Sequence, residues 1–595
     1  MLQYISKLLY VLSESQKKLL LLILIFLTTS ILEALGIGLV GPFLNLAAYP
    51  DSVHKIAFLE WLYQYYNFQS SAQFLFVLGL FIVFVFCIKS VTYFLSKWYI
   101  FKFTFDHQTL ITNRLMNAYL FMPYSLYLNR NTASLIKNIV IEVNHFTFMC
   151  LLPFLEVIIN FVITAALVIL LAKTSLIFLV ASMSLLLPIF FLFNNLGKHF
   201  EGWGEVSSKA QQSIMSAVNH GLGGFKETRI IGCESYFGDQ VELAAHKYAR
   251  SSTLFQSFQI LPRILIETFM VVFLVLTVSV SIILLKNNFQ DLISVLGVFA
   301  IAGMRLVPTA STFFQSLAKL RNGTYALDVL YLDLKEQERN GLNSATNMHI
   351  PISHIPSNRK SIFFDKVEVN NITYRYPNAP KVAIDNLSIS FKKGQSIAFI
   401  GKSGSGKTTL ADIILGLLQP EAGDIYVDGV SIYRDLRAWQ NLIGYIPQSI
   451  FLSDDTIEHN IAFGVPDHLI EAPKMQRAIN AAQLEELIDQ LPDGIATKVG
   501  ERGIRLSGGQ RQRIGIARAL YHEREILVLD EATSALDSET EQLVGQSIDS
   551  LAGEKTLIII AHRLSTIERC DCVYRLDGGR IVKSGKFEEI VTTTS

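Results

Sequence analysis

The sequence of 595 residues predicts a polytopic helical membrane domain followed by a soluble α/β domain. Its composition is 51% hydrophobic and 17% charged, with a mean hydropathy of +0.37, which is too apolar for an ordinary soluble protein. Six long apolar stretches precede residue 315, and from residue 363 onward short β-rich runs alternate with helical patterns. We therefore expect a transmembrane domain at 1–340, a linker at 341–362 and a soluble domain at 363–595.

Each of the six apolar stretches is long enough to cross a bilayer, for which about 20 residues suffice. Two mixed-polar stretches, 101–145 and 194–262, keep helical spacing and are predicted to continue the helices out of the membrane. Lys and Arg concentrate in these stretches and at the N-terminus, so we expect both termini on the cytoplasmic side. The aromatic-rich segment 50–71 is interpreted either as an amphipathic helix at the outer interface or as a surface loop. The predicted spans are Leu19–Ala47, Phe74–Tyr99, Phe146–Ala172, Ser175–Phe193, Ile264–Leu285 and Leu292–Phe314.

The charge and cysteine content exclude several classes of protein. The net charge is +0 and no basic tail or stripe is present, so we expect no nucleic-acid partner. The five cysteines are scattered and match neither a disulfide framework nor a zinc site. Cys570 and Cys572 are interpreted as small core residues of a reduced cytosolic domain.

A glycine-rich stretch lies between a predicted buried strand, 396–400, and a predicted helix, 409–418. Glycines let backbone N–H groups turn toward phosphate oxygens, and a helix N-terminus adds partial positive charge at the same point. Lys407 is placed to contact the β- and γ-phosphates, and the Thr408 hydroxyl to bind Mg²⁺. A tight glycine turn without a ligand is the alternative. The residues predicted to hold a nucleotide here are Gly401, Lys402, Ser403, Gly404, Ser405, Gly406, Lys407, Thr408 and Thr409.

A second part of this site is the apolar run 526–529, which ends in the carboxylates Asp530 and Glu531. Asp530 is placed to hold Mg²⁺ through water, and Glu531 to polarise the attacking water. An acidic turn after a strand is the structural alternative. An Asp-Glu pair that ends an apolar strand downstream of a phosphate loop favours the catalytic interpretation.

The pentapeptide Leu506-Ser507-Gly508-Gly509-Gln510 lies between these two parts. It resembles the signature of the ATP-binding cassette (ABC) family, and the resemblance covers the whole soluble domain. It implies an α/β P-loop cassette with ATP and Mg²⁺ as cofactors. It also implies that Ser507 and the glycine amides close on ATP bound by the opposite cassette.

The same resemblance assigns roles to further residues. Each of them, taken singly, also has a purely structural interpretation, for example Tyr376 as a core aromatic residue. Tyr376 is similar to the aromatic that stacks on adenine, Gln448 to the glutamine that contacts Mg²⁺ and the water, Gly500–Gly503 to the exporter-specific loop, Asp537 to the loop exchanged across the dimer, and His562 to the histidine at the γ-phosphate.

Six spans followed by one cassette resemble the half-transporter ABC exporters. One cassette needs a partner to complete each ATP site, so we expect a second copy of the chain, with a heterodimer as the alternative. In that fold, turns at the tips of the cytoplasmic extensions act as coupling helices, and the candidates here are Tyr124–Thr132 and Gly232–Asp239. An ATP-gated channel or regulatory subunit is a further hypothesis, which the intact Glu531 and signature disfavour.

Charged residues inside the predicted spans are candidates for substrate contacts. Lys89, Arg263 and Arg305 are cations on three different helices and together can bind an anionic group such as phosphate. The alternative is pairing with acidic residues of the spans, for example Arg263 with Glu267 one turn later.

Three stretches, 33–42, 224–229 and 262–268, resemble the subgroup of bacterial lipid-linked oligosaccharide flippases and glycolipid exporters. This implies a multi-pass protein of the bacterial inner membrane, with a cytoplasmic cassette. Its function would be ATP-driven export or flipping of an amphipathic, lipid-linked anionic glycoconjugate. An exporter of hydrophobic peptides or drugs is the alternative, which we rank second because no peptidase domain precedes the first predicted span.

Overall fold

The computed structural model describes most of the chain, and its residues form two compact units. One unit is Met1–Met122 with Arg130–His349, and the other is Pro123–Asn129 with Ile350–Ser595. The predicted linker 341–362 lies outside the described residues. The described residues are 2–12, 57–66, 68, 70–174, 176–284, 289–339, 365–377, 379–531, 550–560 and 567–591, with isolated positions at 22–46 and 542–548.

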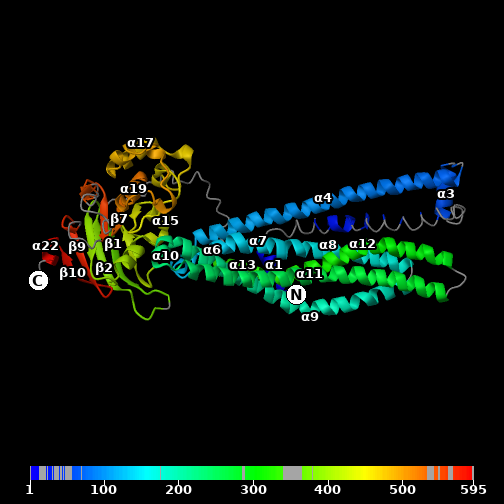
Figure 1. Ribbon diagram of the computed structural model, residues 1–595. Coiled ribbons are helices and arrows are strands. Elements are labelled where there is room, and N and C mark those ends of the chain that lie inside the picture. The colour runs from blue at the N-terminus through cyan, green and yellow to red at the C-terminus, as the bar shows by residue number, and fades with distance from the viewer. Residues whose placement is uncertain are drawn as a thin grey trace. The chain divides into compact units, whose positions relative to one another are not determined.

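The first unit consists of long helices that lie side by side (Figure 1). Five predicted spans coincide with α4, α8, α9, α11 and α12, whereas most of the first, 19–47, lies outside the described residues. By length and composition, three stretches of the described residues qualify as membrane spans: Ser71–Leu120, Thr132–Ile169 and Glu234–Phe273. The helices are α1 (Leu2–Val11), α3 (Ala57–Tyr65), α4 (Ser71–Leu120), α6 (Thr132–Lys137), α7 (Val143–His145), α8 (Leu152–Thr174), α9 (Leu176–Gly223), α10 (Phe225–Ile231), α11 (Glu234–Leu284), α12 (Phe289–Asn322) and α13 (Thr324–Arg339), with the π-helical segments η2 (Asn138–Glu142) and η3 (Phe146–Leu151) between α6 and α8.

Helix α8 contributes a row of buried apolar side chains to the hydrophobic core of this unit. Its leucines and isoleucines recur at every fourth position and are buried, which places them on one face of the helix. Helix α4 instead exposes large apolar side chains along its length, as a bilayer-facing helix does. The row on α8 is Leu155, Ile159, Ile163, Leu167 and Leu171; exposed residues of α4 include Phe76, Phe81, Phe84 and Phe94.

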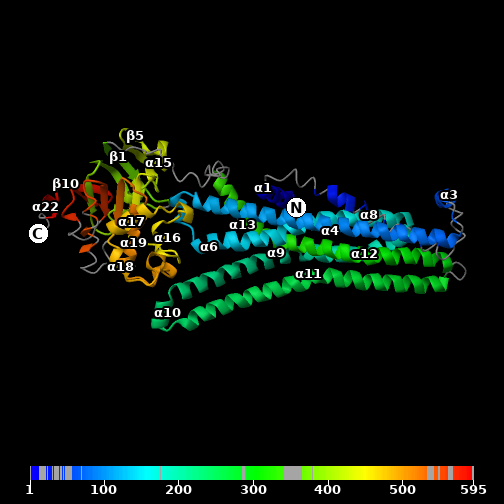
Figure 2. The same cartoon turned by 90° about the horizontal axis from the view of Figure 1, so that it is seen from above.

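Helices α9 and α11 run alongside each other and are joined at one tip by the short helix α10 (Figure 2). Both continue well beyond their predicted spans, so the polar stretch 194–262 is helical, as its spacing predicted. Of the predicted coupling turn Gly232–Asp239, Gly232 and Cys233 form the turn, whereas the residues from Glu234 onward belong to α11. The coupling role of this turn stays a prediction. Gly232 adopts φ +72° at the end of α10, a left-handed conformation that favours glycine, and so ends that helix.

The aromatic segment between the first two predicted spans contains a helix, α3. The rings of Trp61 and Tyr65 stack with centroids 5.3 Å apart, and both side chains are exposed. Tyr63 instead contacts Phe68 and Phe74 in a small cluster at the start of α4. The segment is therefore amphipathic, which matches the helical interpretation of this stretch better than the loop.

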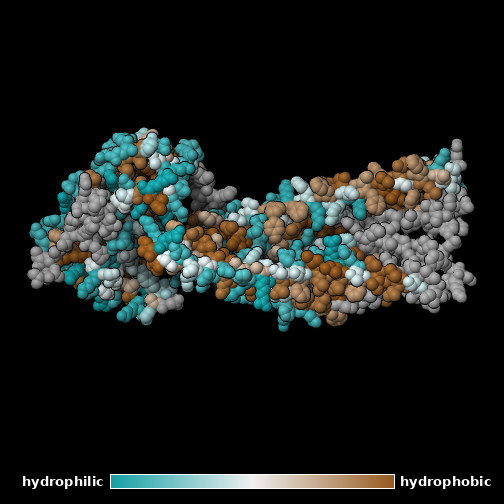
Figure 3. Space-filling model, in the orientation of Figure 1, coloured by the Kyte–Doolittle hydropathy of each residue, from teal (hydrophilic) through white to brown (hydrophobic). Residues whose placement is uncertain are grey.

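The second unit is built on two sheets and carries a largely hydrophilic visible surface, in contrast to the apolar helices (Figure 3). A four-stranded antiparallel sheet has the order β2-β1-β4-β5, and a six-stranded sheet has the order β10-β9-β3-β8-β7-β6. Strands β3, β7 and β8 are buried along nearly their whole length, as strands covered on both faces are. The strands are β1 (Lys366–Tyr374), β2 (Ile384–Lys392), β3 (Ser396–Ile400), β4 (Ala422–Val427), β5 (Val430–Ser431), β6 (Ile443–Ile446), β7 (Ile526–Asp530), β8 (Thr556–Ile560), β9 (Cys572–Asp577) and β10 (Arg580–Gly585); the helices are α5 (Tyr124–Tyr127), α14 (Lys407–Ile414), α15 (Leu436–Gln440), α16 (Ile457–Ile461), α17 (Ala472–Ala481), α18 (Glu485–Asp489), α19 (Gly508–Tyr521) and α22 (Phe587–Val591).

Candidate functional site

The candidate site lies at the carboxyl edge of the parallel strands in the second unit. Phe399 of β3 and Asp530 of β7 both pair with Ile560 of β8, so these three strands end at the same level. Strand β6 ends at Ile446, which pairs with Leu529 of β7. The loops that follow β3, β6 and β7 are therefore neighbours, and this edge is where open α/β sheets bind ligands.

The loop after β3 is held in a conformation that only glycine adopts easily. Gly404 has φ +78° and Gly406 has φ +102°. A Cβ atom at Gly406 would lie 2.9 Å from the carbonyl oxygen of Ala383, so any other residue would be strained and would also clash. The Ser405 hydroxyl is buried and has no hydrogen-bond partner among the described residues. A loop of N–H groups with a free buried hydroxyl suits an oxygen-rich anion.

Lys407 opens helix α14 and directs its ammonium group back into the loop. Its Nζ donates hydrogen bonds to the carbonyl oxygens of Gly401 at 2.8 Å and Lys402 at 3.1 Å. Burial lowers the pKa of Lys407, while the charges of Glu531 and Asp530 act in the opposite direction. The centre of the loop therefore carries a positive charge opposite the two carboxylates.

The acidic end of β7 is joined to the loop after β6 by a direct contact. The Gln448 Nε2 donates a hydrogen bond of 2.6 Å to the Glu531 carboxylate. Glu531 has φ +47°, a left-handed conformation that is uncommon for a residue with a side chain and recurs at functional sites. The backbone N–H of Glu531 donates to the Ile560 carbonyl at 2.8 Å, which helps to fix this conformation. Gln448 and Glu531, predicted as catalytic residues, are thus brought together.

The donors at this edge fit Mg²⁺ bound through phosphate. Mg²⁺ prefers oxygen ligands and usually takes one or two from the protein, with the remainder from phosphates and water. Thr408, Gln448 and Asp530 each offer such an oxygen. The described residues contain no cluster of three or more His, Cys, Asp or Glu side chains that could hold a metal ion alone. Thr408, Gln448 and Asp530 would hold Mg²⁺ together with phosphate oxygens of a bound nucleotide.

Tyr376, predicted to stack on adenine, lies next to the phosphate loop. Its hydroxyl is 3.0 Å from the Thr409 hydroxyl on α14. Its ring is half-buried and meets the Tyr374 ring edge to face, with centroids 5.1 Å apart. One edge of Tyr376 is thus fixed to the helix that follows the loop.

Two residues beside Asp530 were not singled out from the sequence, namely Asp412 and Tyr445. Asp412 on α14 is 9% exposed, and its carboxylate has no hydrogen-bond partner among the described residues. Burial, and then the charge of Asp530, raises the pKa of Asp412 to about 6. Burial and Asp530, to which it is hydrogen-bonded, also raise the pKa of Tyr445. The register of β6 against β7 places Tyr445 near Asp530, and Asp412 approaches Asp530 from α14. No motif contains both residues.

The signature forms the start of helix α19. The Ser507 hydroxyl accepts from the Gln510 N–H at 3.2 Å, and the Gln510 side chain accepts from the Ser507 N–H at 2.8 Å. This capping box holds the helix N-terminus in place while Ser507 itself is exposed. In the described residues, the side-chain hydrogen bonds of Ser507 and Gln510 join these two residues, and those of Lys407 stay within its own loop. One chain therefore presents two separate half-sites.

Some predicted residues cannot be placed. Asp537 and His562 lie outside the described residues, and Arg305 lies on α12 with a side chain outside them. The other two predicted substrate cations lie on α4 and α11. The Lys89 ammonium is 5.1 Å from the centroid of the Phe86 ring, and Arg263 donates to Glu267 at 2.8 Å on the exposed face of α11. The Arg263–Glu267 pair corresponds to the structural alternative given above.

Glu156, the acidic residue of the third predicted span, is bound by residues that the sequence did not single out. Lys97 of α4 lies 3.5 Å from its carboxylate, and the Ser316 hydroxyl of α12 donates to it at 3.1 Å. This polar contact joins the three helices α4, α8 and α12. No sequence signal links the three, because they are far apart along the chain.

Comparisons with known proteins place these features in context. A family model described as "ABC transporter" matches residues 384–534, which include the phosphate loop, the signature and Glu531. An ATP-dependent lipid A-core flippase of Cupriavidus metallidurans is 30% identical over 475 residues, 78% of this chain and 77% of that protein. A second protein with this name, from Pseudomonas aeruginosa, is 44% identical over 230 residues, 38% of each chain. A solved bacterial Atm1-family ABC exporter with ATP bound has a TM-score of 0.71, covering 96% of this chain and 97% of its own, at 22% identity, and thus shares the fold.

Proposed function

This chain belongs to the ABC transporter family, and we propose on that basis that it moves an amphipathic, lipid-linked anionic glycoconjugate outward across the membrane. It is a multi-pass membrane protein that binds ATP and couples ATP hydrolysis to transport. The proposed cargo class is based on the similarity, over 78% of the chain, to a protein named ATP-dependent lipid A-core flippase. The exposed apolar face of α4 and the amphipathic α3 agree with lipid contact.

We assign the following roles to the residues of the nucleotide site. The P-loop holds the phosphates and Lys407 neutralises their charge, while Thr408, Gln448 and Asp530 supply oxygens to Mg²⁺. Glu531 accepts a proton from the attacking water, and Gln448, at 2.6 Å, holds the Glu531 carboxylate in position. Mg²⁺ supplies electrostatic stabilisation of the phosphates when bound. His562 and Asp537 retain the roles that the family motifs assign to them.

A second copy of the chain is proposed to complete each ATP site. The exposed capping box at Ser507 is an anion-binding helix N-terminus that has no phosphate loop facing it in the described residues. The tip helix α10 also exposes large apolar side chains, with Ile230 86% exposed, which favours burial against a partner. Both features agree with a homodimer in which residues 1–340 form the membrane domain and 363–595 the cassette.

Mixing two inactive variants tests the shared site. A Lys407→Ala chain has a defective phosphate loop, and a Ser507→Arg chain has a defective signature. In a mixed dimer, one site combines the intact loop of the second chain with the intact signature of the first. ATPase activity should therefore reappear when the two chains are co-expressed, although each alone is inactive. Continued inactivity of a mixed dimer isolated with two affinity tags would contradict the shared site.

The orientation is proposed from the distribution of Lys and Arg. The N-terminus and both helical extensions are rich in Lys and Arg, so they and the cassette are placed in the cytoplasm of a bacterial inner membrane. A cargo that enters from the cytoplasmic side meets Lys89, Arg263 and Arg305 within the spans. Lys89 offers a point charge, whereas the two arginines offer planar donors that suit phosphate.

Flipping in proteoliposomes tests the cargo class. The purified chain should move a labelled lipid with a phosphorylated sugar head group in an ATP-dependent manner, and a neutral-head analogue at least about five-fold more slowly. The Lys89→Gln and Arg305→Gln double variant should lose this preference while keeping its ATPase activity. Lys102→Gln is the matched control, because Lys102 is also on α4 and lies 5.3 Å from the Trp98 ring centroid. Equal flipping of both lipids by all three proteins would contradict the anion site and favour an exporter of neutral hydrophobic compounds.

A further inference from the structure

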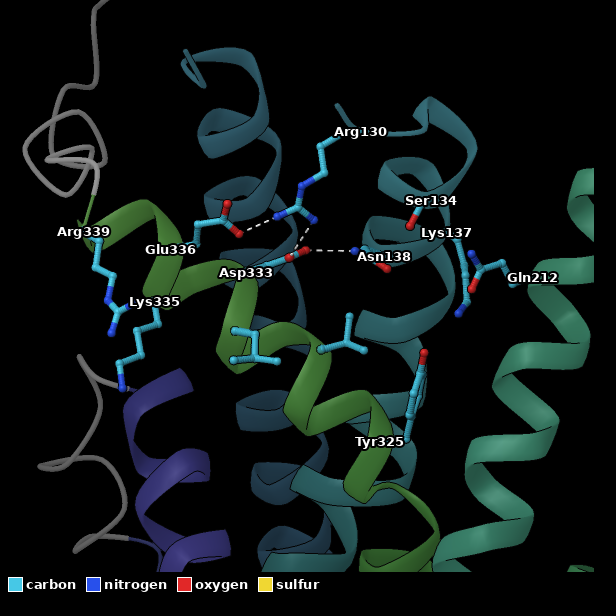
Figure 4. Close-up of a pocket in the computed structure, with 12 residues that line it drawn as sticks. Arg130, Ser134, Lys137, Asn138, Gln212, Tyr325, Asp333, Lys335, Glu336 and Arg339 are labelled. Carbon is cyan, nitrogen blue, oxygen red and sulfur yellow. Dashed lines mark hydrogen bonds and ion pairs between the residues drawn. The ribbon is translucent and has the colours of Figure 1, made fainter. Parts of the chain in front are cut away.

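One buried carboxylate collects contacts from several helices of the first unit. Asp333 lies on α13 and is 7% exposed. Its carboxylate accepts hydrogen bonds from the Asn138 Nδ2 at 2.8 Å and from the Tyr119 hydroxyl, and it lies 3.4 Å from the Arg130 Nη1. Figure 4 shows Arg130, from the bend before α6, and Asn138, from η2, converging on Asp333. Three segments remote from α13 in sequence therefore meet at one residue.

Arg130 has a second carboxylate partner on the same helix. Its Nη2 donates to Glu336, which lies three residues after Asp333 and thus on the same face of α13 (Figure 4). A guanidinium group is a rigid planar fork, so two carboxylates fix its orientation as well as its position. Arg130 and Glu336 are partly exposed, in contrast to Asp333.

A second buried ion pair extends the network to α9. Lys137, at the end of α6, lies 2.8 Å from the carboxylate of Glu142 and donates to the Ser208 hydroxyl at 3.0 Å. Lys137 directly precedes η2 and Glu142 is its last residue, so the ion pair closes over a turn of π-helical geometry, which is rare and recurs at functional sites. Together the two groups of contacts connect α4, α6, η2, α9 and α13.

The position of Arg130 in the chain gives this network its significance. Arg130 directly follows Pro123–Asn129, the one segment from this part of the chain that belongs to the second unit. In that unit, Tyr124 of α5 packs against the hydrophobic core that includes Leu410 and Ile414 of α14, the helix that follows the phosphate loop. At the other end, α13 is the last described helix before the segment that leads to the cassette. The contact between Arg130 and Asp333 thus joins two segments at which the chain passes between its units, namely the segment after α5 and helix α13.

We propose that Asp333 is a positioning residue for coupling, which makes α13 and the segment after α5 move together when nucleotide binds. A displacement of α13 then also displaces the segment after α5, and a displacement of that segment also displaces α13. Without Asp333, the Tyr119 hydroxyl loses its acceptor, and the Asn138 Nδ2 retains only its longer hydrogen bond of 3.3 Å to the Tyr119 hydroxyl among the described contacts. Arg130 then retains Glu336 as its carboxylate partner, so α13 and the segment after α5 can shift independently. The proposal rests on the exporter function of the chain and not on the identity of its cargo.

The surroundings of the network allow such movement. Its residues line a cavity of about 660 Å³ between α6, α9 and α13, with Ser134, Gln212 and Tyr325 among the other lining residues (Figure 4). A cavity beside a polar contact leaves room for helices to change position without a steric clash. It also admits solvent to Arg130 and Glu336, so their charges can be exchanged with less disturbance to the core.

Hydrogen exchange on the full chain in lipid nanodiscs tests the proposal without a cargo. In a Glu531→Gln background, exchange is compared with and without Mg²⁺ and ATP. Peptides from the phosphate loop report nucleotide binding, and peptides from the α9–α10–α11 tip report its effect on the helical unit. In the Asp333→Ala variant, the change at the tip should fall at least five-fold, as expected for loss of an ordinary coupling free energy, while the change at the phosphate loop persists.

A charge exchange distinguishes coupling from mere support of the fold. Arg130→Glu should reduce the tip response as Asp333→Ala does, because it places three carboxylates together. Adding Glu336→Arg should restore the response to within about two-fold, since an arginine then again faces both a glutamate and Asp333. Arg339→Gln is the control, because this exposed residue lines the same cavity.

The proposal is overturned by a normal tip response in Asp333→Ala, or by a charge exchange that folds and binds nucleotide but does not restore the response. If lipid flipping fails in the wild-type chain while the tip response depends on Asp333, only the cargo class is wrong.

Discussion

The nucleotide site and the Asp333 network both hold charged groups in fixed positions, but they are built from different kinds of structural element. In the cassette, the groups lie on loops at one sheet edge, and most belong to short contiguous motifs such as Gly401–Thr408 and Ser507–Gln510. In the helical unit, the groups come one at a time from different helices, as with Tyr119, Asn138 and Asp333.

This difference has a consequence for how each region tolerates substitution. A loop at a sheet edge can lose one side chain while the backbone stays in place, so the chemistry changes more than the stability. A buried contact between helices has no such scaffold, and a lost partner leaves an unsatisfied charge or donor. The cassette should therefore respond to substitution mainly in rate, and the helical unit mainly in stability and coupling.

The largest effect is expected in the cassette, at Glu531. Glu531→Gln removes the proton acceptor, whose contribution as a general base is roughly 10²- to 10⁴-fold, but keeps the shape of the side chain. ATPase activity should fall by at least about 100-fold with little change in the thermal midpoint. Glu523→Gln is a suitable control, because Glu523 is exposed and forms an ion pair with Arg477 on the cassette surface. ATPase activity of the Glu531→Gln variant close to that of wild type would contradict the role assigned to Glu531.

The sequence predicted the parts of the molecule that rest on local patterns. The phosphate loop, the buried strand before it, the signature Leu506–Gln510 and the carboxylates at the end of β7 are each encoded within a few residues. Parallel strand order then brings Gln448 to Glu531, because both follow strands that end at the same edge. The long helices beyond the bilayer were likewise predictable, since helical spacing continues through 194–262.

Contacts between distant helices could not be predicted in this way. Asp333 and Asn138 are separated by 195 residues, and neither belongs to a motif. The turn inside the predicted range Gly232–Asp239 is shorter than expected, because α11 begins at Glu234, a boundary that apolar spacing alone does not give. Asp412 was overlooked for a similar reason, since it reads as one polar residue in a buried helix until β7 places Asp530 beside it.

A second prediction concerns the buried pair of Lys137 and Glu142, in the helical unit. Glu142→Leu leaves the Lys137 ammonium, 2% exposed, without its counter-charge, which costs about 3 kcal/mol of stability. Replacing both residues, as Lys137→Met with Glu142→Leu, removes the charge together with its partner and should restore most of that loss. The thermal midpoint of the detergent-solubilised protein reports both changes. A double variant as unstable as the single one would show that the pair itself, and not the orphaned charge, sets the stability.

A smaller effect, and one that depends on pH, is expected at Asp412. Its pKa in the folded chain is about 6, above the ordinary value of 3.8, so the folded state binds the proton more tightly than the unfolded state does. Its contribution to stability is therefore fully present below pH 3.8 and is lost as the pH rises through about 6. Asp412→Asn should remove this dependence and stabilise the nucleotide-free chain by roughly 2 kcal/mol above pH 7. Thermal midpoints of the two proteins that stay parallel from pH 5 to pH 8 would contradict a protonated Asp412.

The smallest effect is expected on the cassette surface, at His459. Its Nδ1 lies 2.9 Å from Asp455 and its Nε2 lies 3.2 Å from Asp467. The hydrogen bond to Asp455 raises the pKa of His459 above the ordinary value of 6.5, so the stabilisation is fully present below pH 6.5 and is lost as the pH rises through the folded pKa. Because these side chains are partly or largely exposed, His459→Gln should cost only a few tenths of a kcal/mol at pH 6 and less at pH 8. A loss at pH 6 as large as that of Glu142→Leu would contradict the expectation that an exposed ion pair contributes less stability than a buried one.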